Sequence, residues 1–199
     1  MKTQYYTATS LNGYIADEEN SLSWLLQFDD VDGMGEHYAR FMDEVGALAM
    51  GSTTYEWIMA QEDLLNAPEK WPYAAPTWVF SRRSLPAVPG ADIRFVQGDV
   101  RPIHAQMAAA AQGKNSWIVG GGELAGQFHD HGLLDELILT FAPVMLATGA
   151  PLLPRRMAEP PLKLTNVERY GDVFVTLTYE VRKRPFANGR GGDDRGDEE

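Results

Sequence analysis

Short apolar runs alternate with helix-like segments along most of this chain, and this alternation restricts its fold more than any other feature. The strand-like runs are Gln4–Ala8, Ala47–Met50, Thr77–Phe80, Ile93–Val96, Ser116–Val119 and Glu136–Phe141. The helix-like segments between them are His37–Val45, Ser52–Ala60, Val100–Gln112 and Glu123–His131. Strands that alternate with helices predict a mostly parallel sheet.

The pattern changes near the C-terminus, where two long strand-like segments follow each other directly. Leu162–Tyr170 and Val173–Arg182 are separated by Gly171-Asp172, which is a hairpin signal. The sequence therefore predicts an α/β fold with a mostly parallel central sheet, helices on both faces and a C-terminal antiparallel hairpin. Ligands of such sheets bind at the carboxyl ends of the strands, so the loops that follow strands are the candidate site.

The length of 199 residues favours a single domain with a substantial core. We expect that domain to cover residues 1–184. The segment 185–199, PFANGRGGDDRGDEE, is rich in Gly, Asp, Glu and Arg and has almost no apolar residues. Such a composition predicts a flexible acidic tail.

Charge and cysteine content exclude several classes of function. The formal net charge of -11 would repel a nucleic-acid backbone, so no nucleic-acid partner is expected. The absence of cysteine excludes disulfides, thiolate catalysis and cysteine-ligated zinc. The four histidines show no metal-binding spacing, and no metal is expected. Any bound anion must be held by local geometry.

The N-terminus has no signal-peptide pattern. Apolar runs also stay well below the roughly 20 residues that a membrane-spanning helix needs. The sequence therefore predicts a cytoplasmic protein with no membrane partner.

The junction of a strand with three glycines and a helix at Val119–Leu124 is the first candidate site. Gly120, Gly121 and Gly122 would let the backbone approach a ligand, and the helix that begins near Glu123 and Leu124 offers free N–H groups to a pyrophosphate. The letters Gly120-x-Gly122-x-x-Ala125 satisfy a loose dinucleotide fingerprint, but late in the chain and without the acidic residue expected about 20 positions later. A plain tight turn remains the alternative.

Two further strand ends carry residues suited to anions. Gly51, Ser52, Thr53 and Thr54 follow a strand and open a helix, where they can act as a cap or bind an anion, with Glu56 in the first turn. Ser81-Arg82-Arg83 offers a hydroxyl and two guanidinium groups to a phosphate monoester, with a solvated loop as the alternative. Two glycine junctions in one sheet favour a single extended anion between them.

The loop after the first strand is a candidate for closing over a flat ring. It runs Thr9-Ser10-Leu11-Asn12-Gly13-Tyr14-Ile15-Ala16-Asp17 and leads to Trp24 and an acidic cluster at Asp29, Asp30 and Asp32. A carboxyl group held beside apolar side chains has a raised pKa and can donate a proton. An exposed acidic loop is the alternative.

Taken together, these loops resemble the dihydrofolate reductase-like family, in the branch of the C-terminal reductase domain of the bifunctional riboflavin biosynthesis deaminase-reductase. The resemblance covers nearly all of residues 1–183. The segments that carry it are Ala8–Ala16, Met50–Glu56, Phe80–Arg82, Val119–Leu124, Phe141–Val144 and Gly149–Pro154.

The resemblance implies an NADPH site. By the family pattern, Ala8 and Ile15 would contact the nicotinamide, and Ser81 and Arg82 would hold the adenosine 2′-phosphate. The pyrophosphate would lie between two helix N-termini, formed by Gly51, Ser52, Thr53 and Thr54 and by Gly120, Gly121, Gly122, Glu123 and Leu124.

The same resemblance also implies catalytic residues. It places Trp24 on the loop tryptophan of dihydrofolate reductases, Asp29 on their substrate carboxylate and Thr140 on the threonine that supports it. The chain departs from the family at Ser52, where an arginine is usual, and at Glu123, where a basic residue is frequent. The riboflavin branch usually has Asp where this chain has Asn12, and its zinc deaminase domain has no counterpart here.

These observations lead to one main hypothesis and two alternatives. The main hypothesis is an NADPH-dependent reductase of a small heterocyclic substrate, which resembles dihydrofolate reductase or 5-amino-6-(5-phosphoribosylamino)uracil reductase and forms a homodimer. The first alternative is an NADP-binding module of the same fold without turnover. The second is an acidic interaction protein that binds a partner through its tail.

Overall fold

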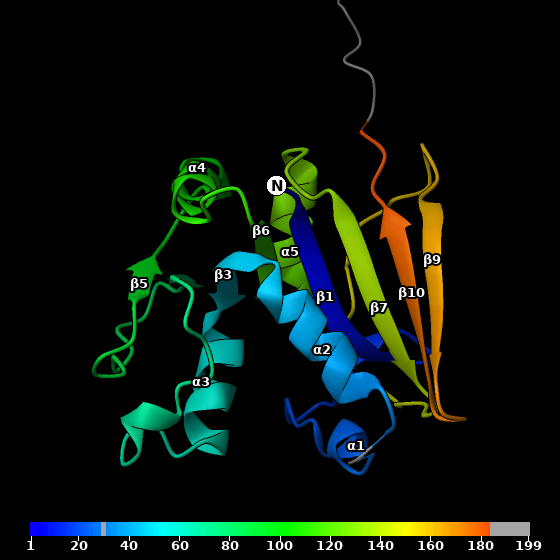
Figure 1. Cartoon of the computed structure of the whole chain (residues 1–199), viewed down its shortest axis with the longest axis horizontal. Helices are drawn as coiled ribbons and strands as arrows, with labels where there is room; N and C mark the ends of the chain where they lie inside the picture. Colours follow the sequence, from blue (N-terminus) through cyan, green and yellow to red (C-terminus); the bar gives the residue numbers. More distant parts are fainter. Residues whose placement is uncertain (29–30, 184–199) are drawn as a thin grey trace, which may run out of the picture.

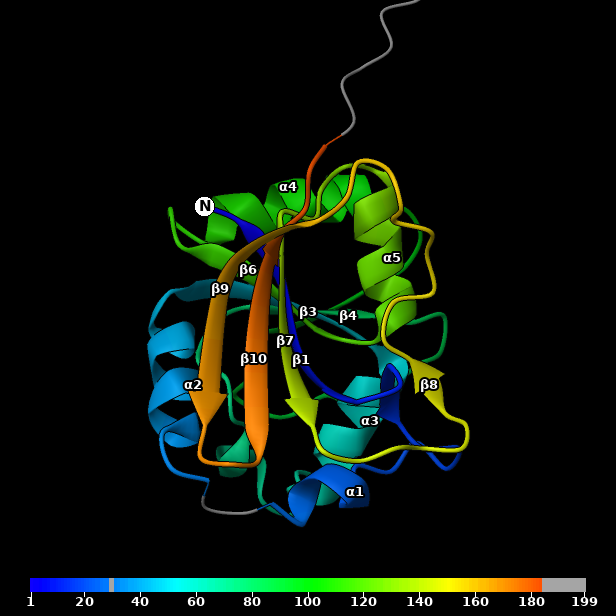
Figure 2. The same cartoon turned by 90° about the vertical axis from the view of Figure 1, so that its right-hand side faces the viewer.

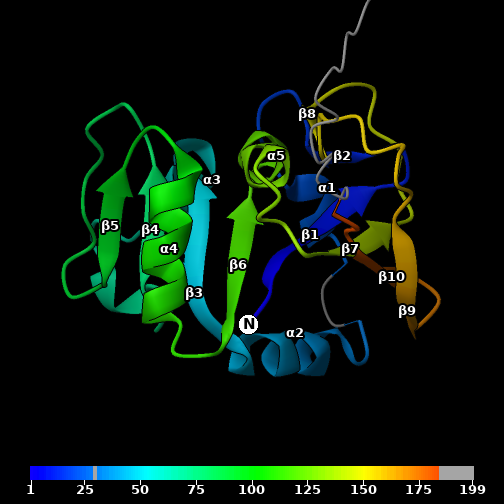
Figure 3. The same ribbon diagram turned by 90° about the horizontal axis from the view of Figure 1, so that it is seen from above.

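The structure is a computed structural model that describes residues 1–28 and 31–183. Eight strands form one sheet in the order β5-β4-β3-β6-β1-β7-β10-β9, which Figure 3 shows from one edge to the other. The strands are β1 (Thr3–Ser10), β3 (Val45–Gly51), β4 (Thr77–Phe80), β5 (Ile93–Val96), β6 (Asn115–Gly120), β7 (Glu136–Ala142), β9 (Lys163–Tyr170) and β10 (Phe174–Glu180).

The sheet confirms the predicted topology. The strands from β5 through β7 all pair in parallel, and β10 pairs antiparallel with both β7 and β9. The hairpin turn lies at Gly171, whose φ of 56° falls in the left-handed region that glycine adopts without steric cost. The antiparallel hairpin therefore forms one edge of an otherwise parallel sheet.

Helices cover both faces, as the alternating pattern predicts. The helices α4 (Val100–Ala110) and α5 (Gly122–Asp130) pack on one face, and α2 (Met34–Asp43) and α3 (Ser52–Gln61) pack on the other. Figure 2 shows α2 and α5 on opposite sides of the part of the sheet that carries β7 and β10. A fifth helix, α1 (Ser23–Leu26), lies below α2 in Figure 1.

The two faces have separate apolar cores because alternate strand residues point to opposite sides. On one face, Tyr5 and Ile118 pack against Phe128 of α5 and Met107 of α4. On the other face, Tyr6, Leu48 and Trp117 pack against Phe41 of α2, and Met50 and Val79 pack against Tyr55, Ile58 and Met59 of α3. These cores fix the position of each helix start relative to the strand before it.

The sequence did not predict four short elements, which are β2 (Tyr14–Ala16), β8 (Ala150–Pro151), α1 and the 3-10 helix η1 (Pro68–Lys70). The first two pair antiparallel as a small second sheet. Each has only two to four residues, which is too short for a periodic pattern to emerge.

In the part of the chain that the structure describes, no helix is long and apolar enough to cross a membrane. Asp29 and the predicted tail at 185–199 lie outside the described residues, so the predictions for them remain predictions.

Candidate functional site

The helices α3 and α5 begin side by side at the carboxyl ends of neighbouring parallel strands. Strands β3 and β6 are adjacent, with Met50 opposite Gly120, and each strand leads directly into its helix. A Cβ atom added at Gly51 would lie 4.0 Å from the carbonyl oxygen of Gly120. The two glycine junctions that the sequence singled out therefore form one continuous surface.

Both helices begin without a side-chain cap. The N-cap residues are Gly51 and Gly121, and neither helix start receives a side-chain hydrogen bond. In α4, by contrast, the Asp99 carboxylate accepts the backbone N–H of Arg101. Uncapped first turns present N–H donors and a positive helix dipole to a ligand.

The predicted cap at Ser52, Thr53 or Thr54 is wrong, because these residues are the first three helical positions and Gly51 is the N-cap. Glu56 also lies beyond the first turn, which contains no acidic residue. Its carboxylate instead pairs with Arg83.

A cavity of about 500 Å³ opens along these two helix starts. The predicted site residues that line it are Ile15, Gly51, Ser52, Thr53, Thr54, Gly120, Gly121, Gly122, Glu123 and Leu124. The other lining residues include Leu22, Trp57, Ile58 and Tyr73. Most of the predicted cofactor-binding residues thus share one cavity of the size that small-molecule sites have.

The small sheet of β2 and β8 holds the loop of Ile15 against α5. The backbone N–H of Leu152 donates to the carbonyl of Gly13 at 2.8 Å, and the Tyr5 hydroxyl donates to the Leu152 carbonyl at 3.1 Å. Asn12 holds the start of the same loop, because its side-chain NH2 group donates to the Leu146 carbonyl and its side-chain oxygen accepts the Leu146 N–H. Ile15 reaches Gly121, where an added Cβ would lie 3.8 Å from its Cδ1 atom.

Arg155, which the sequence did not identify, contacts the site residue Glu123 from outside the residues that line the cavity. Its guanidinium binds both carboxylate oxygens of Glu123 at 2.8 Å and also binds Asp130 at 2.8 Å. These hydrogen bonds lower the pKa of Glu123. The acidic residue at the start of α5 is therefore an ionised carboxylate, paired with a cation that it shares with Asp130. The only sequence signal was that Arg155 directly follows the Gly149–Pro154 motif.

Ser81 and Arg82 follow β4 outside the residues that line the cavity. The Ser81 hydroxyl donates to the Arg83 carbonyl and accepts the Arg83 N–H, which makes a local turn. Arg83 is held by Glu56 in a two-bond ion pair with its shorter contact at 2.6 Å. Arg82 is exposed and forms no ion pair or side-chain hydrogen bond with the described residues.

The remaining predicted residues that the structure describes do not line the cavity. Ala8 and Thr140 are paired across β1 and β7. Thr140 is buried, and its hydroxyl is 2.8 Å from that of Thr176. Trp24 packs in a separate apolar cluster with Tyr170, and its indole nitrogen is buried without a partner among the described residues.

Sequence reasoning also missed Trp57 and Tyr73 as cavity residues. Trp57 lies three residues after Thr54 and so shares its face of α3. Tyr73 lies in an irregular connection between η1 and β4, where no pattern in the sequence signals its position.

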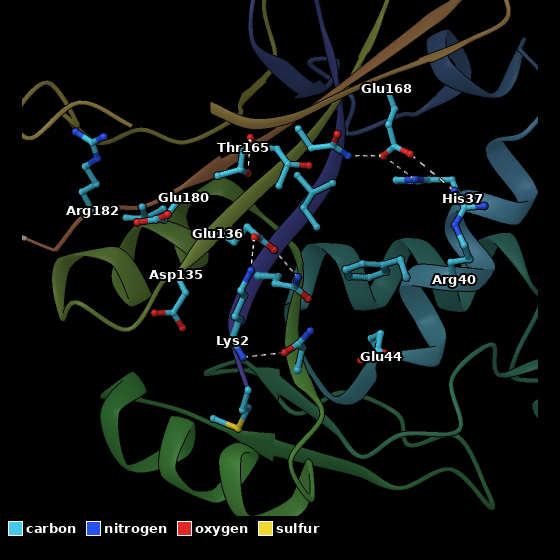
Figure 4. Close-up of a pocket in the computed structure, with 18 of the residues that line it drawn as sticks. Lys2, His37, Arg40, Glu44, Asp135, Glu136, Thr165, Glu168, Glu180 and Arg182 are labelled. Carbon is cyan, nitrogen blue, oxygen red and sulfur yellow. Dashed lines mark hydrogen bonds and ion pairs between the residues drawn. The ribbon is translucent and has the colours of Figure 1, made fainter. Parts of the chain in front are cut away.

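A second, larger groove of about 790 Å³ lies on the α2 side of the sheet, near the chain's N-terminus. Several of its charges pair with each other: Lys2 contacts Glu136 at 2.7 Å, and Arg40 contacts Glu168 at 3.8 Å. Figure 4 shows Glu168 reaching toward His37 and Lys2 lying beside Glu136. No predicted site residue within 1–28 or 31–183 lines this groove.

Comparison with known proteins places the chain among reductase-type folds. The RibD C-terminal domain family matches residues 2–176. The uncharacterized protein YwjB of Bacillus subtilis (strain 168) is 31% identical over 179 residues, which cover 89% of this chain and 97% of YwjB. A candidate riboflavin biosynthesis protein from Shewanella sp. PV-4 has a TM-score of 0.73 and 28% identity over 92% of this chain and all of that one.

A deaminase and 5-amino-6-(5-phosphoribosylamino)uracil reductase from Thermotoga maritima shares the fold with a TM-score of 0.65 at 16% identity. The match covers 91% of this chain and 56% of that chain. The resemblance inferred from the loops is confirmed, and the chain belongs to the RibD C-terminal domain family.

Proposed function

We propose that this chain is an NADPH-dependent reductase of a small heterocyclic substrate. The observation that carries the proposal is the pair of uncapped helix starts, α3 and α5, that line one cavity at the carboxyl ends of β3 and β6. Membership of a family with a reductase-type fold supports an oxidoreductase.

The residues at the helix starts fit the pyrophosphate of a dinucleotide. Backbone N–H groups of Ser52–Thr54 and Gly122–Leu124 can donate from two sides, and the two helix dipoles favour negative charge. The absence of side chains at Gly51 and Gly121 leaves the N-cap positions open to a close ligand. Arg155 supports the fit, because it pairs with Glu123, the one carboxylate among the described lining residues, and so weakens the repulsion between Glu123 and a phosphate.

The state of Arg82 favours NADPH over NADH. Its guanidinium is free of partners among the described residues, so a 2′-phosphate gains a charge-assisted hydrogen bond without breaking an existing ion pair. The neighbouring Arg83 is already paired with Glu56, which favours Arg82 over Arg83 as the proposed 2′-phosphate ligand.

The cofactor would supply the hydride, and the protein would orient the nicotinamide and exclude water. Ala8 lies on β1, and Ile15 lies on β2, which follows it. The pairing of β2 with β8 holds the segment that carries Ile15 in place. We retain Asp29 as the proposed proton donor and Thr140 as its support. To support Asp29, the Thr140 hydroxyl would have to exchange its buried hydrogen bond with Thr176 for one with the Asp29 carboxyl group.

The test is a fluorescence titration of NADPH and NADH, followed by turnover assays with dihydrofolate and with 5-amino-6-(5-phosphoribosylamino)uracil or its dephosphorylated form. The proposal predicts saturable NADPH binding, weaker NADH binding and NADPH oxidation with at least one substrate. Failure to bind either cofactor would refute it.

An NADP-binding module without turnover is the second candidate, favoured by the engagement of Thr140 with Thr176 outside the cavity lining. Tight NADPH binding with no turnover on any of these compounds would support this candidate. A measurable rate that collapses in Asp29→Asn while NADPH affinity stays constant would exclude it.

We also propose that the enzyme works in the cytoplasm as a homodimer. The edge strand β9 leaves one row of backbone groups without a strand partner, and its Leu164 and Val167 side chains are 50% and 54% exposed. Light scattering should give twice the chain mass, and Val167→Lys should shift the protein toward the monomer. A monomeric wild-type protein at micromolar concentration would contradict this assembly.

A further inference from the structure

One wall of the cavity continues from the pyrophosphate end along α3. Trp57 and Ile58 lie three and four residues after Thr54, so all three side chains share one face of the helix. All three also line the cavity. Beyond the helix starts, this wall is therefore apolar and includes the large flat surface of an indole.

Tyr73 and Leu22 add two further apolar side chains to the lining from other parts of the chain. The Tyr73 ring is fixed by edge-on contacts with Trp71 and Trp117, at centroid distances of 5.3 and 5.7 Å. Its hydroxyl has no hydrogen-bond partner among the described residues. Burial raises the pKa of Tyr73, so the phenol stays neutral and can both donate and accept a hydrogen bond.

Charge is scarce in this cavity. Among the described residues that line it there is no Lys, Arg or His, and the one carboxylate, Glu123, is bound to Arg155. A phosphate monoester carries nearly two negative charges and needs guanidinium groups or free N–H groups in compensation. The proposed function assigns the N–H groups of both helix starts to the cofactor.

We propose that the substrate is a flat, uncharged heterocycle without a phosphate group, bound against Trp57, Ile58 and Tyr73. This inference rests on the proposed function, because the cofactor must fill the end of the cavity that the two helix starts form. The Trp57 indole would stack on the ring, and the Tyr73 hydroxyl would pair with a ring nitrogen or carbonyl. The phosphoribosyl group in the name of the Thermotoga maritima reductase would then have no counterpart in this chain's substrate.

Matched pairs of probes test the absence of the charged group. The first pair is 5-amino-6-(5-phosphoribosylamino)uracil and its dephosphorylated form. The second pair is dihydrofolate, with its glutamate carboxylates, and 7,8-dihydropterin, which lacks them. Each compound is titrated calorimetrically into protein saturated with NADPH. We expect the uncharged member of at least one pair to bind at least tenfold more tightly than its charged partner.

Several outcomes overturn the inference. Equal or tighter binding of the charged member in both pairs does so, and so does the failure of both uncharged probes to bind the NADPH-loaded protein. If NADPH itself does not bind, the proposed function has failed, which the preceding cofactor titration reveals separately.

Variants of Trp57 test the binding wall. Trp57→Ala should weaken the uncharged probe at least tenfold and leave NADPH affinity within twofold, whereas Trp57→Phe should retain most of the probe affinity because it keeps a flat ring. An unfolding temperature measured for each variant identifies a loss of fold, in which case the Phe variant decides. Probe affinity that is unchanged in both variants contradicts stacking on Trp57.

Discussion

At the scale of single residues, two adjacent arginines differ in their availability to a ligand. Arg83 is engaged by Glu56, and Arg82 is free of partners among the described residues. We predict that Arg82→Ala weakens NADPH binding by about ten- to a hundredfold, because a hydrogen bond between charged groups contributes roughly 1.5–3 kcal/mol. NADH binding should not change.

Arg83→Ala is the matched control for this measurement and should alter the NADPH to NADH ratio less than threefold. Fluorescence titration of both cofactors with both variants gives the answer. A larger loss of NADPH affinity in Arg83→Ala than in Arg82→Ala would reverse the assignment of the 2′-phosphate ligand.

A second prediction at this scale concerns the pairing of Glu123 with Arg155. In Arg155→Ala the carboxylate at the start of α5 loses the cation that binds both of its oxygens. It would then repel the nearby pyrophosphate, so we expect NADPH affinity to fall by about threefold to tenfold.

The double variant Arg155→Ala/Glu123→Gln should restore most of this affinity, because it removes the unpaired charge. The NADPH dissociation constants of Arg155→Ala, Glu123→Gln and the double variant complete the double-mutant cycle. A double variant that binds no better than Arg155→Ala would show that Arg155 acts in another way.

At the scale of secondary-structure elements, long periodic segments were predictable and short ones were not. The ranges predicted for β4 and β5 match the structure residue for residue, because each is a short strand-like run between clear breaks. The positions of α3 and α5 also followed from strand-glycine-helix patterns. The pairing of β2 with β8 joins residues more than 130 positions apart, and only long-range contacts define it.

The same limit explains which parts of the cavity were predictable. Gly51 and Gly120 belong to local motifs, and the parallel topology brings them together. Tyr73 and Arg155 reach the site from irregular connections, where tertiary packing alone sets the direction of a side chain. Loop residues of this kind carry no periodic signal.

The contact between α5 and β8 gives a prediction about stability. A Cβ atom at Gly122 would overlap the backbone carbonyls of Pro151 and Leu152. Gly122→Ala should therefore destabilise the fold by about 1–3 kcal/mol, the usual cost of overpacking. Urea unfolding measures the free energy of unfolding. The control is Gly35→Ala in α2, where an added Cβ meets nothing within 4 Å. Equal stability of the two variants would argue against this close contact.

At the scale of the whole molecule, the buried His37 and the half-buried His104 link stability to pH. Burial lowers the pKa of His37 and of His104, with Glu168 and Asp135 as opposing influences. His37 shares a hydrogen bond with the Tyr170 hydroxyl and His104 shares one with the Thr3 hydroxyl, and these bonds join α2 and α4 to the sheet.

In the unfolded chain both histidines have a pKa of about 6.5. Between that pH and the lowered pKa values of the folded protein, the unfolded state therefore binds more protons than the folded state. The stabilisation is fully present above pH ~6.5 and is lost as the pH falls through the folded pKa values. We predict a fall in the free energy of unfolding from pH 7 to pH 5, and a flatter profile in His37→Asn/His104→Gln. Identical pH profiles of the wild-type protein and the double variant would contradict this origin.

The central claim is that a cofactor pyrophosphate lies between the starts of α3 and α5, and Gly51→Ala tests it most directly. Gly51 has an ordinary φ of -79°, and its added Cβ would come no closer than 4.0 Å to the Gly120 carbonyl oxygen, so the fold should be retained. The methyl group would nevertheless occupy the space at the N-cap that the pyrophosphate needs.

The decisive measurement is the NADPH dissociation constant of Gly51→Ala beside that of Gly35→Ala, with unfolding temperatures for both. We predict at least tenfold weaker binding in Gly51→Ala at an unchanged unfolding temperature, and wild-type binding in Gly35→Ala. NADPH binding by Gly51→Ala with wild-type affinity would contradict the placement of the pyrophosphate between the two helices.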